Sequence, residues 1–182
     1  MPATRFARLA CGVLFLIGPI SGDAAWAADV FSISSPAFSP GKPIPSRYAF
    51  AQDNVSPELH IANIPKKARS LALIVDDPDA PMGLWTHWLV WNLPAVTTSL
   101  PEGAPLPGQA CEGKNSFGQV RYDGPAPPSG TNRYFFHLYV LDTVLSLSAG
   151  ADRAALEAAM KGHILARAQM FGTYQHGANP PP

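Results

Sequence analysis

The chain is poor in charge and in cysteine. Of its 182 residues, 14% are charged, with 13 basic and 13 acidic side chains, and two are cysteine. The absence of any run or stripe of Lys and Arg argues against nucleic acid as a partner. No apolar run reaches the roughly 20 residues that cross a bilayer, so we expect no membrane span. The hydrophobic share of 47% is nevertheless enough for one globular domain with a substantial core.

The signatures of common enzyme classes are missing as well. The sequence has no G-x-S-x-G turn, no Walker loop, no Rossmann fingerprint and no H-E-x-x-H motif. From the sequence we therefore expect neither a cofactor nor a bound metal, and a binding role takes precedence over catalysis.

The first residues have the layout of a secretory signal peptide. Arg5 and Arg8 form a positive segment, Leu9 to Ile20 is largely apolar, and Ala25-Trp26-Ala27 is a small-x-small cleavage site. The apolar stretch is too short for a membrane anchor. We expect residues 1–27 to be removed on export, which places the protein in the periplasm or outside a bacterial cell.

The remaining residues, 28–182, are predicted to form a single domain with its core at about residues 31–175. This segment keeps one cysteine, Cys111, and so forms no internal disulfide. We expect Cys111 to be a small buried hydrophobe rather than a reactive thiol.

Short apolar runs separated by turn residues predict an antiparallel β-sandwich. The chain has 20 prolines and 15 glycines, which lie mostly between these runs. The run Ser70–Asp76 (SLALIVD) is almost continuously apolar, which is typical of a strand covered on both faces. The other predicted strands are Phe31–Ser34, Leu59–Ile64, Thr86–Leu93 and Arg133–Leu141.

Helix is expected only near the end of the chain. Asp152 is a suitable N-cap for the alanine-rich segment that follows it. Ile164–Phe171 is predicted to be a second helical stretch that ends at Gly172. Strands first and helices late predict one or two peripheral C-terminal helices on a sheet-on-sheet core.

Three carboxylates crowd into four positions where the SLALIVD strand ends. They are Asp76, Asp77 and Asp79. Pro78 lies between the last two acids and Pro81 follows them, and the fixed φ of proline limits the conformational freedom of the loop. A solvated turn would explain them, since Asp is favoured in turns. The functional interpretation is that partial burial raises the pKa of one acid, which then keeps its proton and donates a hydrogen bond to an anion.

His87 is the second candidate group. It alternates with Leu89, Trp91 and Leu93, so we expect these four side chains to share one face of their strand. A histidine in such a strand is commonly a structural core residue. Beside carboxylates it is more readily protonated and can then hold a phosphate or carboxylate.

Four blocks follow one another along the chain: Asn54–Leu59 (NVSPEL), Ser70–Pro81 (SLALIVDDPDAP), Trp85–Val90 (WTHWLV) and Tyr122–Tyr134 (YDGPAPPSGTNRY). Together they resemble the phosphatidylethanolamine-binding protein family, and within it the bacterial branch described as Raf kinase inhibitor-like. The similarity covers about residues 31–175, and the second and fourth blocks in combination are its most specific part.

The resemblance implies a β-sandwich with a pocket at one end that accepts phosphate and related anions, including phospholipid head groups. By position, two aspartates and one histidine would be its polar groups, a tryptophan part of its wall and a proline part of its rim. The ligand-binding residues expected in this way are Asp77, Asp79, Trp85, His87, Pro127, Asn132 and Tyr134.

This chain departs from the family pattern at Asn132, where the family usually has a histidine before Arg-Tyr. An amide can donate a hydrogen bond but carries no positive charge. We therefore predict weaker phosphate binding, with a flatter pH dependence, than in relatives with two histidines. Ala126 also stands where a cysteine is common in the bacterial branch, with no clear consequence.

The function expected from the sequence is that of an exported, non-catalytic binding protein for a small anion or phosphorylated head group. A regulated or inhibited target protein and a homodimer are further expectations from the resemblance. The alternative is a hydrolase with Asp77 or Asp79 as base and His87 as acid or metal ligand, since such a set can hold a divalent metal.

Overall fold

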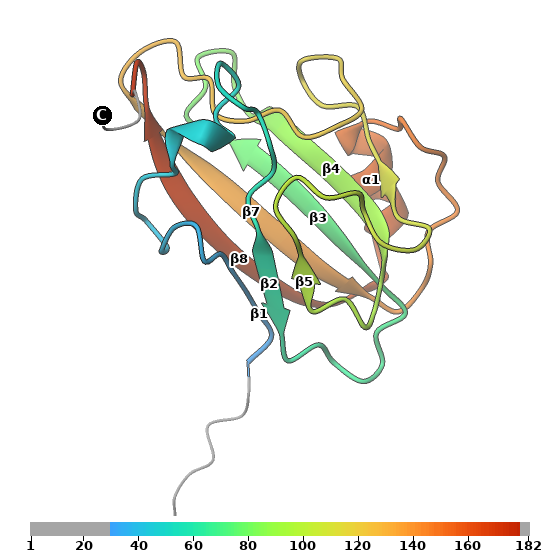
Figure 1. The fold of residues 1–182 in the computed structure, drawn as a ribbon. Coiled ribbons are helices and arrows are strands. Elements are labelled where there is room, and N and C mark those ends of the chain that lie inside the picture. Colours follow the sequence, from blue (N-terminus) through green and yellow to red (C-terminus); the bar gives the residue numbers. More distant parts are fainter. Residues whose placement is uncertain (1–29, 179–182) are drawn as a thin grey trace, which may run out of the picture.

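The apolar runs form strands in two antiparallel sheets, as the sequence predicts. The computed structural model describes residues 30–178, so the expected signal peptide, residues 1–27, lies outside the described residues. The larger sheet has the order β6-β4-β3-β7-β8, and the smaller one has the order β1-β2-β5 (Figure 1). The larger sheet consists of β3 (Ser70–Asp77), β4 (Trp85–Pro94), β6 (Cys111–Glu112), β7 (Thr131–Leu141) and β8 (Ile164–Gln175). The smaller sheet consists of β1 (Ser32–Ser34), β2 (Leu59–Ala62) and β5 (Ser99–Leu100).

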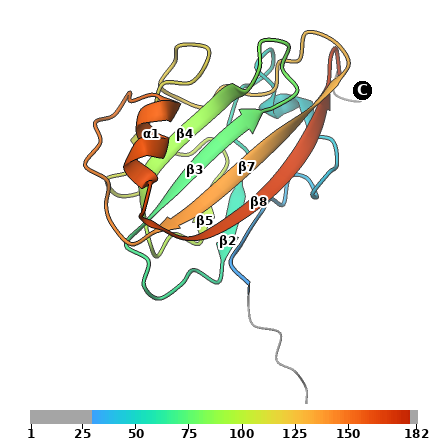
Figure 2. The same ribbon diagram turned by 180° about the vertical axis from the view of Figure 1, so that it is seen from behind.

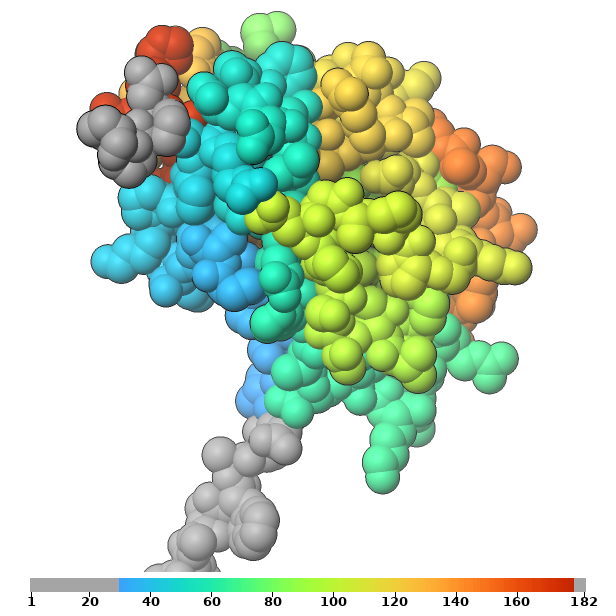
Figure 3. Space-filling view, in the orientation of Figure 1, coloured from blue at the N-terminus to red at the C-terminus, as the bar shows by residue number. Residues whose placement is uncertain are grey.

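The central strand β3 is buried on both faces, which confirms the prediction from its sequence. All eight of its residues are buried. Leu71, Leu73 and Val75 face the smaller sheet and belong to the main core, together with the alternating apolar residues of β7. Ala72 and Ile74 face the other way, into a second core beneath the helix. Loops before and after the short strands form much of the surface over the smaller sheet (Figure 3).

The α-helix lies on the opposite face of the larger sheet (Figure 2). This helix, α1 (Arg153–Met160), begins where Asp152 accepts a hydrogen bond from the Ala155 N–H at 2.9 Å, so the predicted N-cap is confirmed. Leu156 and Met160 seal the second core. A short 3-10 helix, η1 (Ser46–Tyr48), precedes β2. Neither helix of residues 30–178 has the length and apolar character that crossing a membrane requires.

The prediction of a second helix over Ile164–Phe171 is wrong, because this segment is the first part of strand β8. Every residue of β7 from Thr131 to Leu141 has a partner in β8. The residues of β8 that face the main core alternate with exposed ones, as in Ala166, Arg167 and Ala168. Small alanines suit a helix by propensity, but long-range pairing with β7 decides the outcome.

Strand β4 departs from regular alternation at His87. Val75 pairs with Trp88 and Asp76 with Thr86, so His87 is an extra residue in a β-bulge. As a consequence Leu89 and Trp91 pack into the core beneath α1, while the His87 ring lies 5.2 Å from that of Tyr134 on the other side of the sheet. The expectation that His87 shares a face with Leu89, Trp91 and Leu93 is therefore wrong for Leu89 and Trp91. Leu93 belongs to the main core, because a second register shift lies opposite Leu71 and Leu73.

Cys111 also differs from expectation. It lies in the two-residue strand β6 and is half-buried rather than fully buried, with its side chain at the border of the core beneath α1.

Candidate functional site

The three acids at the end of β3 point in different directions. Asp76 lies on the helix side, where its Oδ2 accepts a hydrogen bond from Arg153 at 2.7 Å and its Oδ1 lies 3.3 Å from His137 Nε2. Burial alone would raise the pKa of Asp76, but the hydrogen bonds and charges of His137 and Arg153 outweigh it, so the pKa is lowered. Asp76 is thus part of a buried ion pair that fastens α1 to the sheet.

Asp79 is held at the surface by Arg133. The guanidinium donates from Nε and Nη2 to the carboxylate at 2.8 and 2.7 Å, and the Arg133 backbone N–H donates to it at 2.9 Å. These hydrogen bonds lower the pKa of Asp79. The hypothesis of a raised pKa is therefore wrong for both Asp76 and Asp79.

Asp77 turns to the side of the smaller sheet and is 3% exposed. Its Oδ1 accepts a hydrogen bond from the Asp79 backbone N–H, and its Oδ2 accepts one from the Asn132 side-chain amide, both at 2.8 Å. Two N–H donors on the two oxygens are the pattern expected for an ionised carboxylate. The side-chain amide of Asn132 therefore helps to hold Asp77 in place.

His87 has a defined tautomer. Its Nδ1 lies 2.7 Å from the backbone oxygen of Asp123, which can only accept, so Nδ1 carries the proton. Its Nε2 has no hydrogen-bond partner among residues 30–178. Burial lowers the pKa of His87, although the Asp123 carbonyl and the charge of Asp77 act in the opposite direction. The ring is thus neutral around pH 7, with an unshared electron pair on Nε2.

A buried network fixes this histidine from behind. The carboxylate of Asp123 is fully buried and accepts hydrogen bonds from the side chains of Asn54, Asn115 and Arg121 at 2.8, 2.9 and 3.1 Å. Its backbone N–H donates to the carbonyl of His87 at 3.1 Å. The sequence places Asn54 and Asp123 in family-like blocks but assigns them no role, because their contacts span 69 residues of chain.

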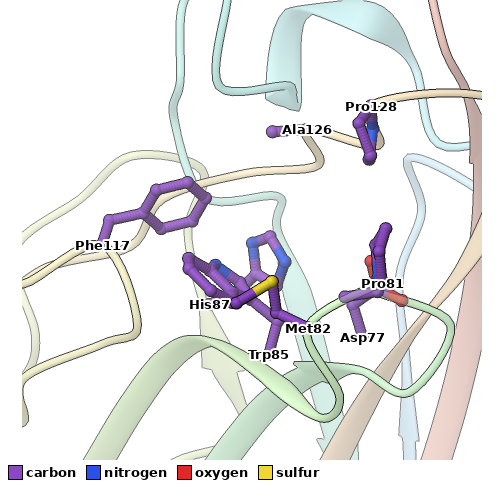
Figure 4. Close-up of a pocket in the computed structure, with 9 residues that line it drawn as sticks. Asp77, Pro81, Met82, Trp85, His87, Phe117, Ala126 and Pro128 are labelled. Carbon is purple, nitrogen blue, oxygen red and sulfur yellow. The ribbon is translucent and has the colours of Figure 1, made fainter.

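Asp77 and His87 line a pocket of about 220 Å³ at one end of the sandwich. Figure 4 shows side chains from the β3–β4 loop and from two loops across it directed toward a common space. Its lining residues are Asp77, Ala80, Pro81, Met82, Trp85, His87, Phe117, Ala126 and Pro128. Phe117 packs edge-on against both Trp85 and His87, with ring centroids 5.4 and 5.5 Å away.

The structure brings together some of the predicted residues and leaves others outside. Asp77, Trp85 and His87 line the pocket. Tyr134 lies behind His87, and its hydroxyl is the one fully buried side-chain N or O atom without a partner among residues 30–178. Pro127 is not itself among the lining residues, but it stands between two of them, Ala126 and Pro128, and its carbonyl accepts a hydrogen bond from His176.

Sequence reasoning missed the other lining residues. Met82 and Phe117 carry no polar group that would single them out, and they come from two different loops. Within residues 30–178, no three His, Cys, Asp or Glu side chains gather as a metal ion would require.

Comparison with known proteins shows the family of the chain. The model of the family described as phosphatidylethanolamine-binding protein matches residues 34–175. The chain belongs to this family. A UPF0098 protein of Methanothermobacter thermautotrophicus is 46% identical over 150 residues, which cover 80% of this chain and 99% of the relative. A UPF0098 protein of Chlamydia muridarum is 45% identical over 148 residues, covering 79% and 97% of the two chains.

Solved structures show the same family fold. A putative phosphatidylethanolamine-binding protein homologue from Chlamydia trachomatis superposes with a TM-score of 0.76 at 43% identity, covering 80% of this chain and 97% of that one. YbcL of Escherichia coli, described as a member of the mammalian family, superposes with a TM-score of 0.75 at 29% identity, covering 80% and 98%. Membership of the family and its mostly-β fold, both expected from the sequence, are confirmed.

Proposed function

We propose that this family member is an exported, non-catalytic binding protein whose pocket holds a phosphate-like anion or a phosphorylated head group. The observation that carries the proposal is a pocket nitrogen without a partner. His87 lines the pocket and its Nε2 has no hydrogen-bond partner among the described residues, and behind it the buried hydroxyl of Tyr134 has none either. Buried polar groups are rarely left without a partner, so a bound molecule or water is expected there.

The size of the pocket supports a small ligand. Pockets for drug-sized molecules commonly occupy about 300–1,000 Å³, and this one occupies about 220 Å³. A head group fits such a volume, whereas acyl chains of a lipid would have to remain outside. The apolar residues Pro81, Met82 and Phe117 around the polar floor suit the carbon atoms next to a phosphate.

A calorimetric titration of the purified protein with phosphoethanolamine tests the proposal. We expect saturable binding of one equivalent, and at least a tenfold loss in His87→Ala. His60→Ala is the matched control, because His60 is an exposed histidine on β2 that pairs with Glu58. The same samples are assayed for released phosphate, and turnover would favour the hydrolase alternative. Absence of binding, or an equal effect of both substitutions, would contradict the proposal.

Export is a separate part of the proposal, supported by the charge and hydropathy pattern of residues 1–27. Its test is the intact mass of protein recovered from the periplasm or medium of the native bacterium. A chain that begins at residue 28 is the expected result, and an uncleaved chain retained in the cytoplasm would contradict it. Native mass spectrometry of the same material would reveal a co-purified ligand.

A further inference from the structure

The pocket has an unusual charge for a site that takes anions. Asp77 is the one charged side chain among its lining residues, and no Lys or Arg lines it. Arg133, the cation nearest to Asn132 in the chain, is held by two side-chain hydrogen bonds on Asp79. An anion that enters this pocket meets a carboxylate and no compensating positive charge.

The pocket also offers hydrogen-bond acceptors that need a donor. Because Nδ1 of His87 donates to the Asp123 carbonyl, Nε2 of the neutral ring can only accept. The two oxygens of Asp77 accept one hydrogen bond each from protein and keep further acceptor capacity. A ligand that carries no proton leaves these acceptors unused.

A donor is present among the lining residues. Trp85 lines the pocket and its indole N–H makes no hydrogen bond within residues 30–178, whereas the unpartnered hydroxyl of Tyr134 is buried behind His87. Burial and the charge of Asp77 raise the pKa of Tyr134, so its hydroxyl remains a donor. The pocket therefore suits a ligand that both accepts and donates hydrogen bonds.

Resting on the proposed function, we infer that the pocket selects the singly protonated form of a phosphate monoester over anions that carry no proton. The ligand's P–OH group donates to Asp77, and its remaining oxygens accept from Trp85 in the pocket wall. A sulfate ester can only accept hydrogen bonds, so it leaves the acceptors of the pocket without a donor. An ammonium ion can only donate them, so it leaves the donors of the pocket without an acceptor. The ionisable groups that line the pocket are Asp77 from β3 and His87 from β4. Behind His87 lie Tyr134 from β7 and the Asp123–Arg121 pair. The Asp79–Arg133 pair lies outside the pocket.

Three probes of similar size distinguish the possibilities: methyl phosphate, methyl sulfate and methylammonium. A phosphate monoester has a second pKa of about 6, so the protonated form falls roughly tenfold in abundance between pH 5 and pH 7. We expect the affinity of the full-length protein for methyl phosphate to fall by about the same factor of ten over this range. Methyl sulfate, an anion without a proton at either pH, is expected to bind more weakly than methyl phosphate at pH 5 and with little change.

Methyl sulfate is also the control for titration of the protein. If protonation of His87 drives anion binding, both anions gain affinity in parallel at low pH, and the inference is overturned while the proposed function stands. Tighter binding of methylammonium than of methyl phosphate at pH 5 overturns it as well. If none of the anions binds at either pH, the proposed function itself fails.

Asp77→Asn removes the carboxylate with little change of shape. The variant is expected to bind methyl sulfate and methyl phosphate about equally, with less than about a twofold change between pH 5 and pH 7. Asp142→Asn, in an exposed acid that pairs with His163, is the control and should match the unmodified protein. Retained preference for methyl phosphate in Asp77→Asn contradicts the inference. If thermal melting shows that this variant does not fold, the comparison of methyl phosphate with methyl sulfate still decides.

Discussion

Asp76 and Asp77 are neighbours in the chain and have opposite fates. Asp76 turns toward α1, where Arg153 and His137 satisfy its carboxylate. Asp77 turns toward the loops, where its partners are neutral amides and no cation lines the adjoining pocket. Because side chains alternate along a strand, two adjacent acids can serve two faces of one sheet. One acid fastens the helix to the sheet, and the other lines the pocket.

The pocket side of the sheet depends on close backbone packing at Gly124. Gly124→Ala is expected to lower the free energy of unfolding more than any other substitution considered. A Cβ at residue 124 would lie 1.8 Å from the carbonyl oxygen of Tyr48. The loop that carries Ala126 and Pro128 would have to move, which we expect to lower the free energy of unfolding by at least about 3 kcal/mol. Chemical denaturation measures this change.

Gly130→Ala in the same loop is the matched control. A Cβ there meets no atom within 4 Å, and the cost comes from its positive φ of 62°. We expect a loss of about 1 kcal/mol. Equal losses in the two variants would show that the contact with Tyr48 is not what holds the loop.

The helix side is tested by Asp76→Asn, with the next largest effect. The substitution leaves Arg153 beside a neutral amide in a half-buried site, so we expect the free energy of unfolding at pH 7 to fall by about 2–3 kcal/mol. The folded-state pKa of Asp76 is below its usual value of 3.8, so its contribution is present above that pH and is lost as the pH falls through the folded-state pKa. The difference between variant and unmodified protein should therefore disappear in strong acid.

Asp76→Asn also tests whether the two acids act independently of each other. Asp76 lies on the face of the sheet opposite to the pocket, so Asp76→Asn is expected to bind methyl phosphate within about twofold of the unmodified protein. A large loss of binding in a variant that still folds at 25 °C would show that the two faces are coupled.

The contrast between the two faces also marks how far sequence reasoning reaches. The apolar run of β3 and the alternation of β7 depend on burial, which the sequence records directly, and both strands lie where they were predicted. The direction of His87 depends on a bulge, which arises from how β4 pairs with β3. The local sequence does not predict that bulge, so His87 was assigned to the wrong face of the strand.

Long-range pairing accounts for the other misses. The segment Ile164–Phe171 has helix-forming residues, yet β7 offers it a complete set of partners and it becomes a strand. Asp79 was expected to bind the ligand by its position in the family pattern, and it is not among the residues that line the pocket. Its engagement by Arg133, 54 residues away, could not be foreseen without coordinates.

The most specific effect is expected from Asn132→His. The amide of Asn132 donates to Asp77 without adding charge, so a protonated histidine at this position would place on the pocket side the kind of cation that Asp76 already has on the helix side. A unit charge near a bound anion favours binding, and we expect affinity for methyl phosphate to rise about tenfold at pH 5.5, or about 1.4 kcal/mol. The gain should shrink as the histidine loses its proton toward pH 8.

Methyl sulfate separates this gain from titration of the ligand, because it carries no proton at either pH. In the unmodified protein its affinity is expected to be nearly constant between pH 5.5 and pH 8, whereas in Asn132→His it should fall as the pH rises. Asn132 is buried, so the melting temperature of the variant is measured first to establish that the larger ring is accommodated. A folded variant with unchanged affinity and an unchanged pH profile would show that charge at this position does not control the pocket.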